Sequence, residues 1–154
     1  MNYQIFEAQA TSYHQSVRRV NARREHWQNV TKPILRRLLE DARKYLKIDG
    51  VVNVNEGIHN LESVFLTYNN MPSGLMDGNR SITYFGGYLN FAQTVNGKIM
   101  IMIFYPRIEA MTTTMAPKQL EIVEPEEVAE SLVVRVLHVF FKELLQWQES
   151  YCIQ

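Results

Sequence analysis

The chain has 154 residues, of which 46% are hydrophobic and 21% charged, and its formal net charge at pH 7 is zero. These values are ordinary for a globular domain with a hydrophobic core, and they exclude a disordered chain or a strongly basic one. No apolar run reaches the roughly eighteen residues that a membrane-spanning helix needs. The single cysteine, Cys152, cannot close an internal disulfide, and the N-terminus lacks the pattern of a secretory signal. We therefore expect a cytoplasmic protein.

Charge is distributed unevenly along the chain. Residues 1–50 contain ten Lys or Arg and five acidic residues, a net charge of +5, whereas residues 119–154 contain two basic and seven acidic residues, a net charge of −5. The two ends can neutralise each other within one chain or between two copies. Either pairing lowers the positive potential that nucleic acid would require.

The N-terminal segment predicts a long helix with a narrow apolar stripe. Its apolar residues are spaced by four and three positions and interrupted only at Arg24, which is typical of a coiled-coil seam. Two interpretations stay open: the helix lies across its own domain, which we favour, or it pairs with a helix of another chain. The stripe consists of Phe6, Ala10, Tyr13, Val17, Val20 and Trp27, and its last four members are the interface candidates.

A second amphipathic helix is expected to begin near Pro33, because proline is tolerated in the first turn of a helix and disrupts later turns. Its apolar positions run from Ile34 to Leu46, and Asp49 and Gly50 are expected to end it. The two helices, over 5–48, form either one kinked rod or a hairpin, and they can project from the sheet core.

Two short strands are expected next, at 51–54 and 61–68. The following segment, 69–80, is rich in turn-forming residues and predicts a loop. Such a loop acts either as a flexible tip or as a functional lid, with Met71, Leu75 and Met76 as apolar anchors.

The central element is predicted to be a β-hairpin over 81–107. Asn96 and Gly97 lie between two β-prone runs and predict a two-residue type I′ turn with Val95 opposite Lys98. The run 99–105 is apolar on both sides of its strand, although a half-exposed strand should alternate between apolar and polar residues. We therefore expect both sides to be covered, by helices of the same chain or by another chain.

The C-terminal third predicts an irregular connection, a short strand at 119–123 and a long helix. Glu124 and Pro125 are expected to open this helix, which is apolar over more than half of its circumference. The whole chain then forms one α+β domain over 1–154. It comprises two N-terminal helices, an antiparallel β-meander of four to five strands centred on the 81–107 hairpin, and a C-terminal helix packed on the sheet.

Tyrosines and an arginine mark a candidate site on one side of the hairpin. The predicted register places Gly86 opposite Arg107, and a glycine leaves a gap in the side-chain layer or marks a bulge. This group would suit an anionic or flat ligand, or a protein interface. The alternative, which we weigh more heavily, is that a helix covers it or that the Gly-Gly pair shifts the register. The candidates are Tyr84, Tyr88, Tyr105, Arg107 and Glu109.

The remaining chemistry-bearing residues form no recognised motif. The sequence has no glycine-rich phosphate loop and no catalytic or metal-ligand pattern, so we expect no metal and no cofactor. The basic helices offer a nucleic-acid surface, which we weigh below a solvated face or a partner for the acidic tail. Its candidates are Arg18, Arg19, Arg23, Arg24, Arg36 and Arg37.

These observations favour a non-catalytic protein-interaction or assembly protein that acts as a homodimer. The doubly apolar strand, the heptad-like seam and the opposite charges of the two ends support it. One alternative is a sensor-like domain or an enzyme that binds a small ligand in a Tyr- and Arg-lined pocket. The other is nucleic-acid binding through the basic helices, which we disfavour. Enzymatic activity stays open, with no motif in its favour.

Overall fold

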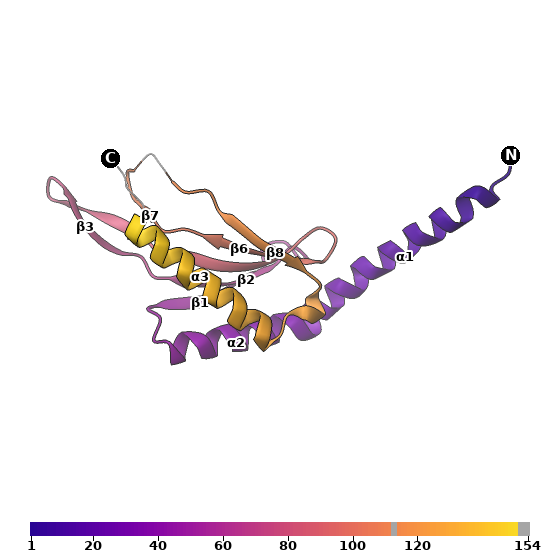
Figure 1. The fold of residues 1–154 in the computed structure, drawn as a ribbon, viewed down its shortest axis with the longest axis horizontal. Helices are drawn as coiled ribbons and strands as arrows, with labels where there is room; N and C mark the ends of the chain where they lie inside the picture. Colours follow the sequence, from indigo (N-terminus) through magenta and orange to yellow (C-terminus); the bar gives the residue numbers. More distant parts are fainter. Residues whose placement is uncertain (112–113, 151–154) are drawn as a thin grey trace.

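The computed structural model describes residues 1–111 and 114–150 and has the predicted α+β fold (Figure 1). Its helices are α1 (Gln4–His26), α2 (Lys32–Tyr45) and α3 (Glu130–Ser150). Its strands are β1 (Gly50–Asn55), β2 (Ser63–Tyr68), β3 (Met71–Asp77), β4 (Arg80–Phe85), β5 (Tyr88–Gln93), β6 (Ile99–Phe104), β7 (Arg107–Ile108) and β8 (Lys118–Val123).

The strands form two antiparallel sheets, one with the order β1-β2-β5-β6-β8 and one with the order β3-β4-β7. The pairing of β5 with β6 continues in register into the pairing of β4 with β7, where Phe85 lies opposite Arg107. The smaller sheet therefore prolongs the larger one beyond a bend. The prediction of a loop over 69–80 was wrong, because most of this segment is strand β3, with a bulge between Pro72 and Met76.

The bend between the sheets requires glycine at position 86. A Cβ atom on Gly86 would lie 2.4 Å from the carbonyl oxygen of Tyr68 and 2.7 Å from its Cβ. The end of strand β2 therefore lies beside the β4–β5 connection at a distance that leaves no room for a side chain.

We expect Gly86→Ala to lower the free energy of unfolding by about 3 kcal/mol, because backbone atoms must move to admit the methyl group. Gly57→Ala is the control: its Cβ would approach only the side-chain oxygen of Asn55, at 3.2 Å, and its effect should stay within about 0.5 kcal/mol. Urea denaturation measures both. Equal midpoints for the two variants would contradict the close approach at Gly86.

The predicted turn register of the β5–β6 hairpin was wrong by one residue. Gln93 pairs with Ile99, and residues 95–97 form a three-residue loop that closes with Gly97 at φ 83°. Contacts from α1 favour this loop: Arg23 donates to the carbonyl oxygen of Asn96 (3.2 Å) and Arg24 to that of Val95 (3.0 Å).

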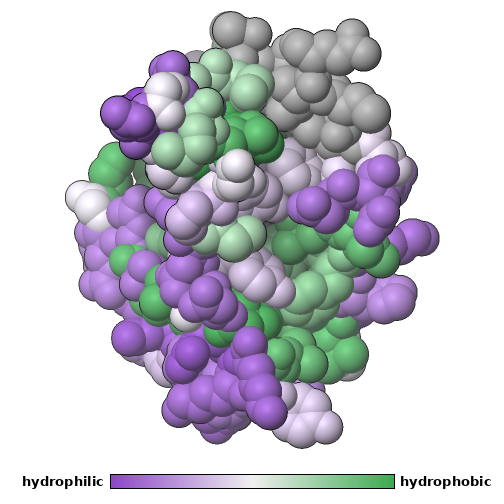
Figure 2. All heavy atoms as spheres, turned by 90° about the vertical axis from the view of Figure 1, so that its left-hand side faces the viewer, coloured by the Kyte–Doolittle hydropathy of each residue, from purple (hydrophilic) through white to green (hydrophobic). Residues whose placement is uncertain are grey.

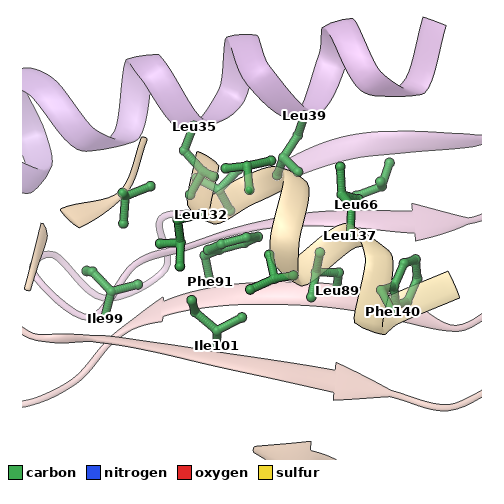
Figure 3. Packing of buried hydrophobic residues seen from close by; sticks show 14 of the residues in the cluster. Leu35, Leu39, Leu66, Leu89, Phe91, Ile99, Ile101, Leu132, Leu137 and Phe140 are labelled. Carbon is green, nitrogen blue, oxygen red and sulfur yellow. The ribbon is translucent and has the colours of Figure 1, made fainter. Parts of the chain in front are cut away.

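The corrected register gathers the largest apolar side chains on one face of the larger sheet. Ile99, Ile101 and Ile103 are fully buried on this face together with Leu89 and Phe91. Helices α2 and α3 supply the other half of this core with Leu35, Leu39, Leu132, Leu137 and Phe140 (Figure 3). The prediction that helices of the same chain cover the apolar strand is therefore confirmed for this face.

Helices α1 and α2 form one rod through a π-helical turn, Trp27–Thr31. Of the two arrangements predicted for these helices, the structure has the rod and not the hairpin. The wider turn is a response to Pro33, which has no N–H to donate and whose ring would collide with the preceding turn. Helix α2 ends at Tyr45, earlier than predicted, and Lys47 leaves it at φ 53°. At the other end of the chain, Pro125–Glu127 is a separate 3-10 turn, so α3 begins at Glu130 rather than at Glu124.

A buried carboxylate joins this rod to the sheet. Glu62 Oε1 accepts hydrogen bonds from Trp27 Nε1 (3.1 Å), Gln28 Nε2 (2.9 Å) and Lys32 Nζ (3.0 Å), and the Glu62 side chain is 4% exposed. Its backbone N–H donates to the Gln93 side chain in β5 at 3.0 Å. Burial alone raises the pKa of Glu62, but the three hydrogen bonds outweigh it and the pKa lies below its ordinary value.

This pKa shift predicts a pH dependence of stability. Because the folded-state pKa of Glu62 lies below the unfolded-state value near 4.5, its stabilisation is present above that value and is lost as the pH falls through the lower pKa. Urea midpoints measured from about pH 6 to about pH 3 should fall more steeply for the wild type than for Glu62→Gln. Parallel profiles would contradict this assignment.

Candidate functional site

Helix α1 extends away from the rest of the molecule (Figure 1) and has no buried residue. Tyr13 and Val17, two of the predicted seam residues, are 67% and 43% exposed, and Phe6 is 49% exposed. Val20 is half-buried and Trp27 lies fully in the core. The favoured interpretation, a helix lying across its own domain, is therefore wrong for residues 4–19, whose apolar stripe no other described part of the chain covers.

The base of α1 is fixed by ionic contacts. Arg23 donates through Nε to Glu124 Oε2 (2.7 Å) and through Nη2 to Glu124 Oε1 (3.1 Å), and hydrogen bonding to Arg23 is the main cause of the lowered pKa of Glu124. This pair joins the basic N-terminal third to the acidic C-terminal segment within one chain. Together with the Arg24 contact to the hairpin loop, it sets the direction in which α1 leaves the body.

The second face of the larger sheet, here called the outer face, lies opposite the helices. Its aromatic side chains contact one another: the rings of Tyr88 and Phe104 stack 4.3 Å apart, and those of Phe65 and Tyr88 are 5.7 Å apart. All are only half-buried, and neither α2 nor α3 packs on this face. The apolar residues of the outer face are Val51, Phe65, Tyr88, Ala92, Met100, Met102, Phe104 and Ile122.

The outer face ends in an open hollow of about 400 Å³ at the bend. Three of the predicted tyrosine and arginine candidates border it, namely Tyr88, Tyr105 and Arg107. The Arg107 guanidinium lies 4.0 Å above the centre of the Phe85 ring, a cation–π contact that holds the charge at the edge of the hollow. The Tyr105 hydroxyl donates to Glu143 Oε2 (2.8 Å), and burial together with this bond raises the pKa of Tyr105 to about 12.

The other two candidates lie elsewhere. Tyr84 is on the opposite side of the sheet, in edge contact with Trp147 of α3 (5.9 Å), and it borders a second hollow of about 450 Å³. Figure 2 looks onto this end of the molecule, where apolar and polar side chains both reach the surface. Glu109 pairs with Arg80. The predicted pairing of Gly86 with Arg107 was wrong, because Phe85 is the residue opposite Arg107. Tyr84 lies opposite Ile108 and not opposite Glu109.

The six arginines predicted as nucleic-acid candidates also fall into two groups. Arg23 and Arg24 are engaged in contacts within the chain, whereas the other four arginines are exposed. Two residues of the structure were not predicted from sequence patterns. The hydrogen-bond donors to the Glu62 carboxylate lie 30 or more residues away in the sequence, and the role of Phe85 depends on the corrected register. Within residues 1–111 and 114–150, no three His, Cys, Asp or Glu side chains are placed to hold a metal ion.

No protein-family model matches the chain, and no curated protein and no solved structure matches it either. Among the helices described, none has the length and apolar content needed to cross a membrane.

Proposed function

We propose that this protein is a non-catalytic interaction protein that acts as a cytosolic homodimer. The observation that carries the proposal is the uncovered apolar stripe of α1, on a helix that the body holds away from itself. Most of the stability of a protein helix comes from packing of its apolar face, and residues 4–19 of α1 have no such packing against the rest of the described chain. The outer face, with its half-buried aromatic and methionine side chains, is a second surface of the same kind.

Burial of the α1 stripe against a second copy would supply the driving force for self-association. Phe6, Tyr13 and Val17 are 49%, 67% and 43% exposed in the single chain, and in a dimer both copies would bury them. Removal of apolar surface from water is the main favourable term in protein association, and it is opposed by the loss of translational and rotational freedom.

Light scattering of the full chain tests this proposal. At concentrations of tens of micromolar we expect a mass twice the 18.0 kDa of one chain, with dissociation on dilution. A mass of 18.0 kDa at every concentration up to the millimolar range would rule out the homodimer.

A second candidate function is supported by the hollow at Arg107. Its volume of about 400 Å³ lies within the range of about 300–1,000 Å³ that is usual for small-ligand sites. Its lining includes the Arg107 guanidinium and the aromatic residues Phe85 and Tyr88. Such a site would take a flat anionic ligand, in a sensor-like domain or an enzyme.

A thermal-shift titration with benzoate, and with uncharged benzamide as the reference ligand, tests the second candidate. A site at Arg107 should give stabilisation by benzoate that Arg107→Gln abolishes and Arg80→Gln preserves, since Arg80 pairs with Glu109 outside the hollow. Absence of any benzoate shift in the wild type would remove this candidate.

A further inference from the structure

The stripe of α1 contains two complete heptads and part of a third. We label the stripe residues with the heptad positions a and d. The a residues recur every seven positions, and each d residue lies three positions after an a residue. Tyr3, which precedes α1 in helical backbone conformation and is 68% exposed, belongs to the same stripe. The stripe, here called the α1 seam, comprises Tyr3, Ala10 and Val17 at a and Phe6, Tyr13 and Val20 at d. All six are exposed except Val20, which is half-buried at the base of the helix.

Side-chain volumes in the α1 seam match in one relative orientation of two helices. In an antiparallel pair an a residue faces a d residue, which places Ala10 against Tyr13 and Val17 against Phe6, a small residue with a large one in each layer. In a parallel pair each residue faces its own copy. Two Tyr13 side chains would then crowd one layer while two Ala10 side chains leave the next one empty, and both faults are unfavourable in a packed seam.

The position of the hairpin loop is a second, independent argument against the parallel orientation. The hairpin loop at residues 95–97 lies against the seam side of α1 near its base: a Cβ on Gly97 would be 2.8 Å from Arg23 Cβ and 3.1 Å from the Val20 carbonyl oxygen. A parallel partner helix in register would bring its own loop and body to the same place. An antiparallel partner overlaps the exposed part of α1 and carries its body at the opposite end.

We propose that the partner of the α1 seam is the α1 helix of a second copy, aligned antiparallel so that Ala10 of each copy packs against Tyr13 of the other. This inference rests on the proposed homodimer and specifies its interface. The flanking positions agree with it, because Glu7 and His14 both occupy position e, and e residues of antiparallel helices lie on the same flank. Glu7 of one copy therefore lies near His14 of the second.

Distances between spin labels distinguish this arrangement from the others. Gln4 and Thr11 are exposed and occupy equivalent positions one heptad apart, so each receives a label as the only cysteine, Gln4→Cys or Thr11→Cys, in a Cys152→Ser chain. With Ala10 opposite Tyr13, an antiparallel pair separates the two Gln4 positions by about 22 Å along the helix axis and the two Thr11 positions by only about 1.5 Å. A parallel pair gives both sites the same separation.

We expect a clearly longer distance for the Gln4 label than for the Thr11 label in samples that are dimeric by light scattering. Equal distances would overturn the antiparallel interface and leave a dimer of another orientation. A sample can also be dimeric while neither label gives a distance short enough for contact between α1 helices. The second copy would then bind elsewhere, for example on the outer face, and this result would also overturn the antiparallel interface. A monomeric sample would remove both this inference and the homodimer.

Discussion

Replacing Glu62 by alanine is expected to lower the free energy of unfolding by about 3 kcal/mol. Breaking a buried ion pair typically costs 3–5 kcal/mol, because the remaining charge keeps its desolvation penalty. Here Lys32 retains a hydrogen bond to Gln28 Oε1 (2.9 Å) and a longer contact with Glu56 (3.9 Å), which favours the lower end of that range. The Trp27 indole N–H also loses its acceptor in the core.

Glu56→Ala is the matched control for this measurement. This substitution removes the other carboxylate near Lys32. Because Glu56 is 54% exposed and lies 3.9 Å from Lys32, the free energy of unfolding should fall by no more than about 1 kcal/mol. Urea denaturation with an unchanged slope reports both values. If Glu62→Ala and Glu56→Ala destabilise the protein equally, Glu62 does not fix the rod to the sheet.

Replacing Val17 by glutamate is expected to weaken self-association by about 100-fold or more, which corresponds to roughly 2.7 kcal/mol. The carboxylate would have to lose water between two helices, and both copies carry it. Because Val17 is 43% exposed in the single chain, the stability of the monomer should be nearly unchanged. Sedimentation equilibrium measures the association constant directly.

Gln15→Glu adds the same charge to the same helix on the side away from the α1 seam. It should leave the association constant within about a factor of three, since exposed charges contribute little. A dimer that tolerates Val17→Glu as well as it tolerates Gln15→Glu would exclude the seam as the interface.

Much of the fold follows from local patterns in the sequence. The spacing of apolar residues predicted both amphipathic helices, the C-terminal helix and strands β1, β2, β5, β6 and β8, because side-chain periodicity depends only on local backbone geometry. Segment ends were less predictable. Strand β3 was missed because Pro72, Gly74 and Gly78 are turn formers, although here they lie in a bulged and exposed hairpin.

The hairpin register depends on residues far away in the chain. Asn96 and Gly97 suit a two-residue turn and also the last two positions of a three-residue loop. Contacts from Arg23 and Arg24 favour the second, and no local pattern contains that information. A shift of one residue moves every side chain of a strand to the other face relative to its partner strand. The predicted turn, with Val95 opposite Lys98, would place Ile101 opposite Ala92, whereas Ile101 pairs with Phe91 in the structure. The same shift makes Phe85, and not Gly86, the neighbour of Arg107.

The candidate site was predictable in part for the same reason. Tyr88, Tyr105 and Arg107 border one hollow because they lie close together around the bend, where a shift of one residue matters little. Tyr84 lies on the opposite side because Gly86 and Gly87 interrupt the strand between β4 and β5, which ends the alternation that would have kept Tyr84 on the same face as Tyr88. The direction of α1 was beyond sequence reasoning, because it depends on the π-helical turn and on the contacts of Glu62 and Glu124 with the rod.

Hydrogen exchange of the α1 backbone amides tests the need for a partner most directly. Residues 4–19 have no tertiary cover within the described chain, so an unpaired α1 should open often and exchange quickly at any protein concentration. Pairing between two copies predicts that protection of these amides increases as the protein concentration is raised, while protection of the core strand β6 stays constant. Fast exchange of residues 4–19 at every concentration would contradict the account, and so would strong protection that is independent of concentration.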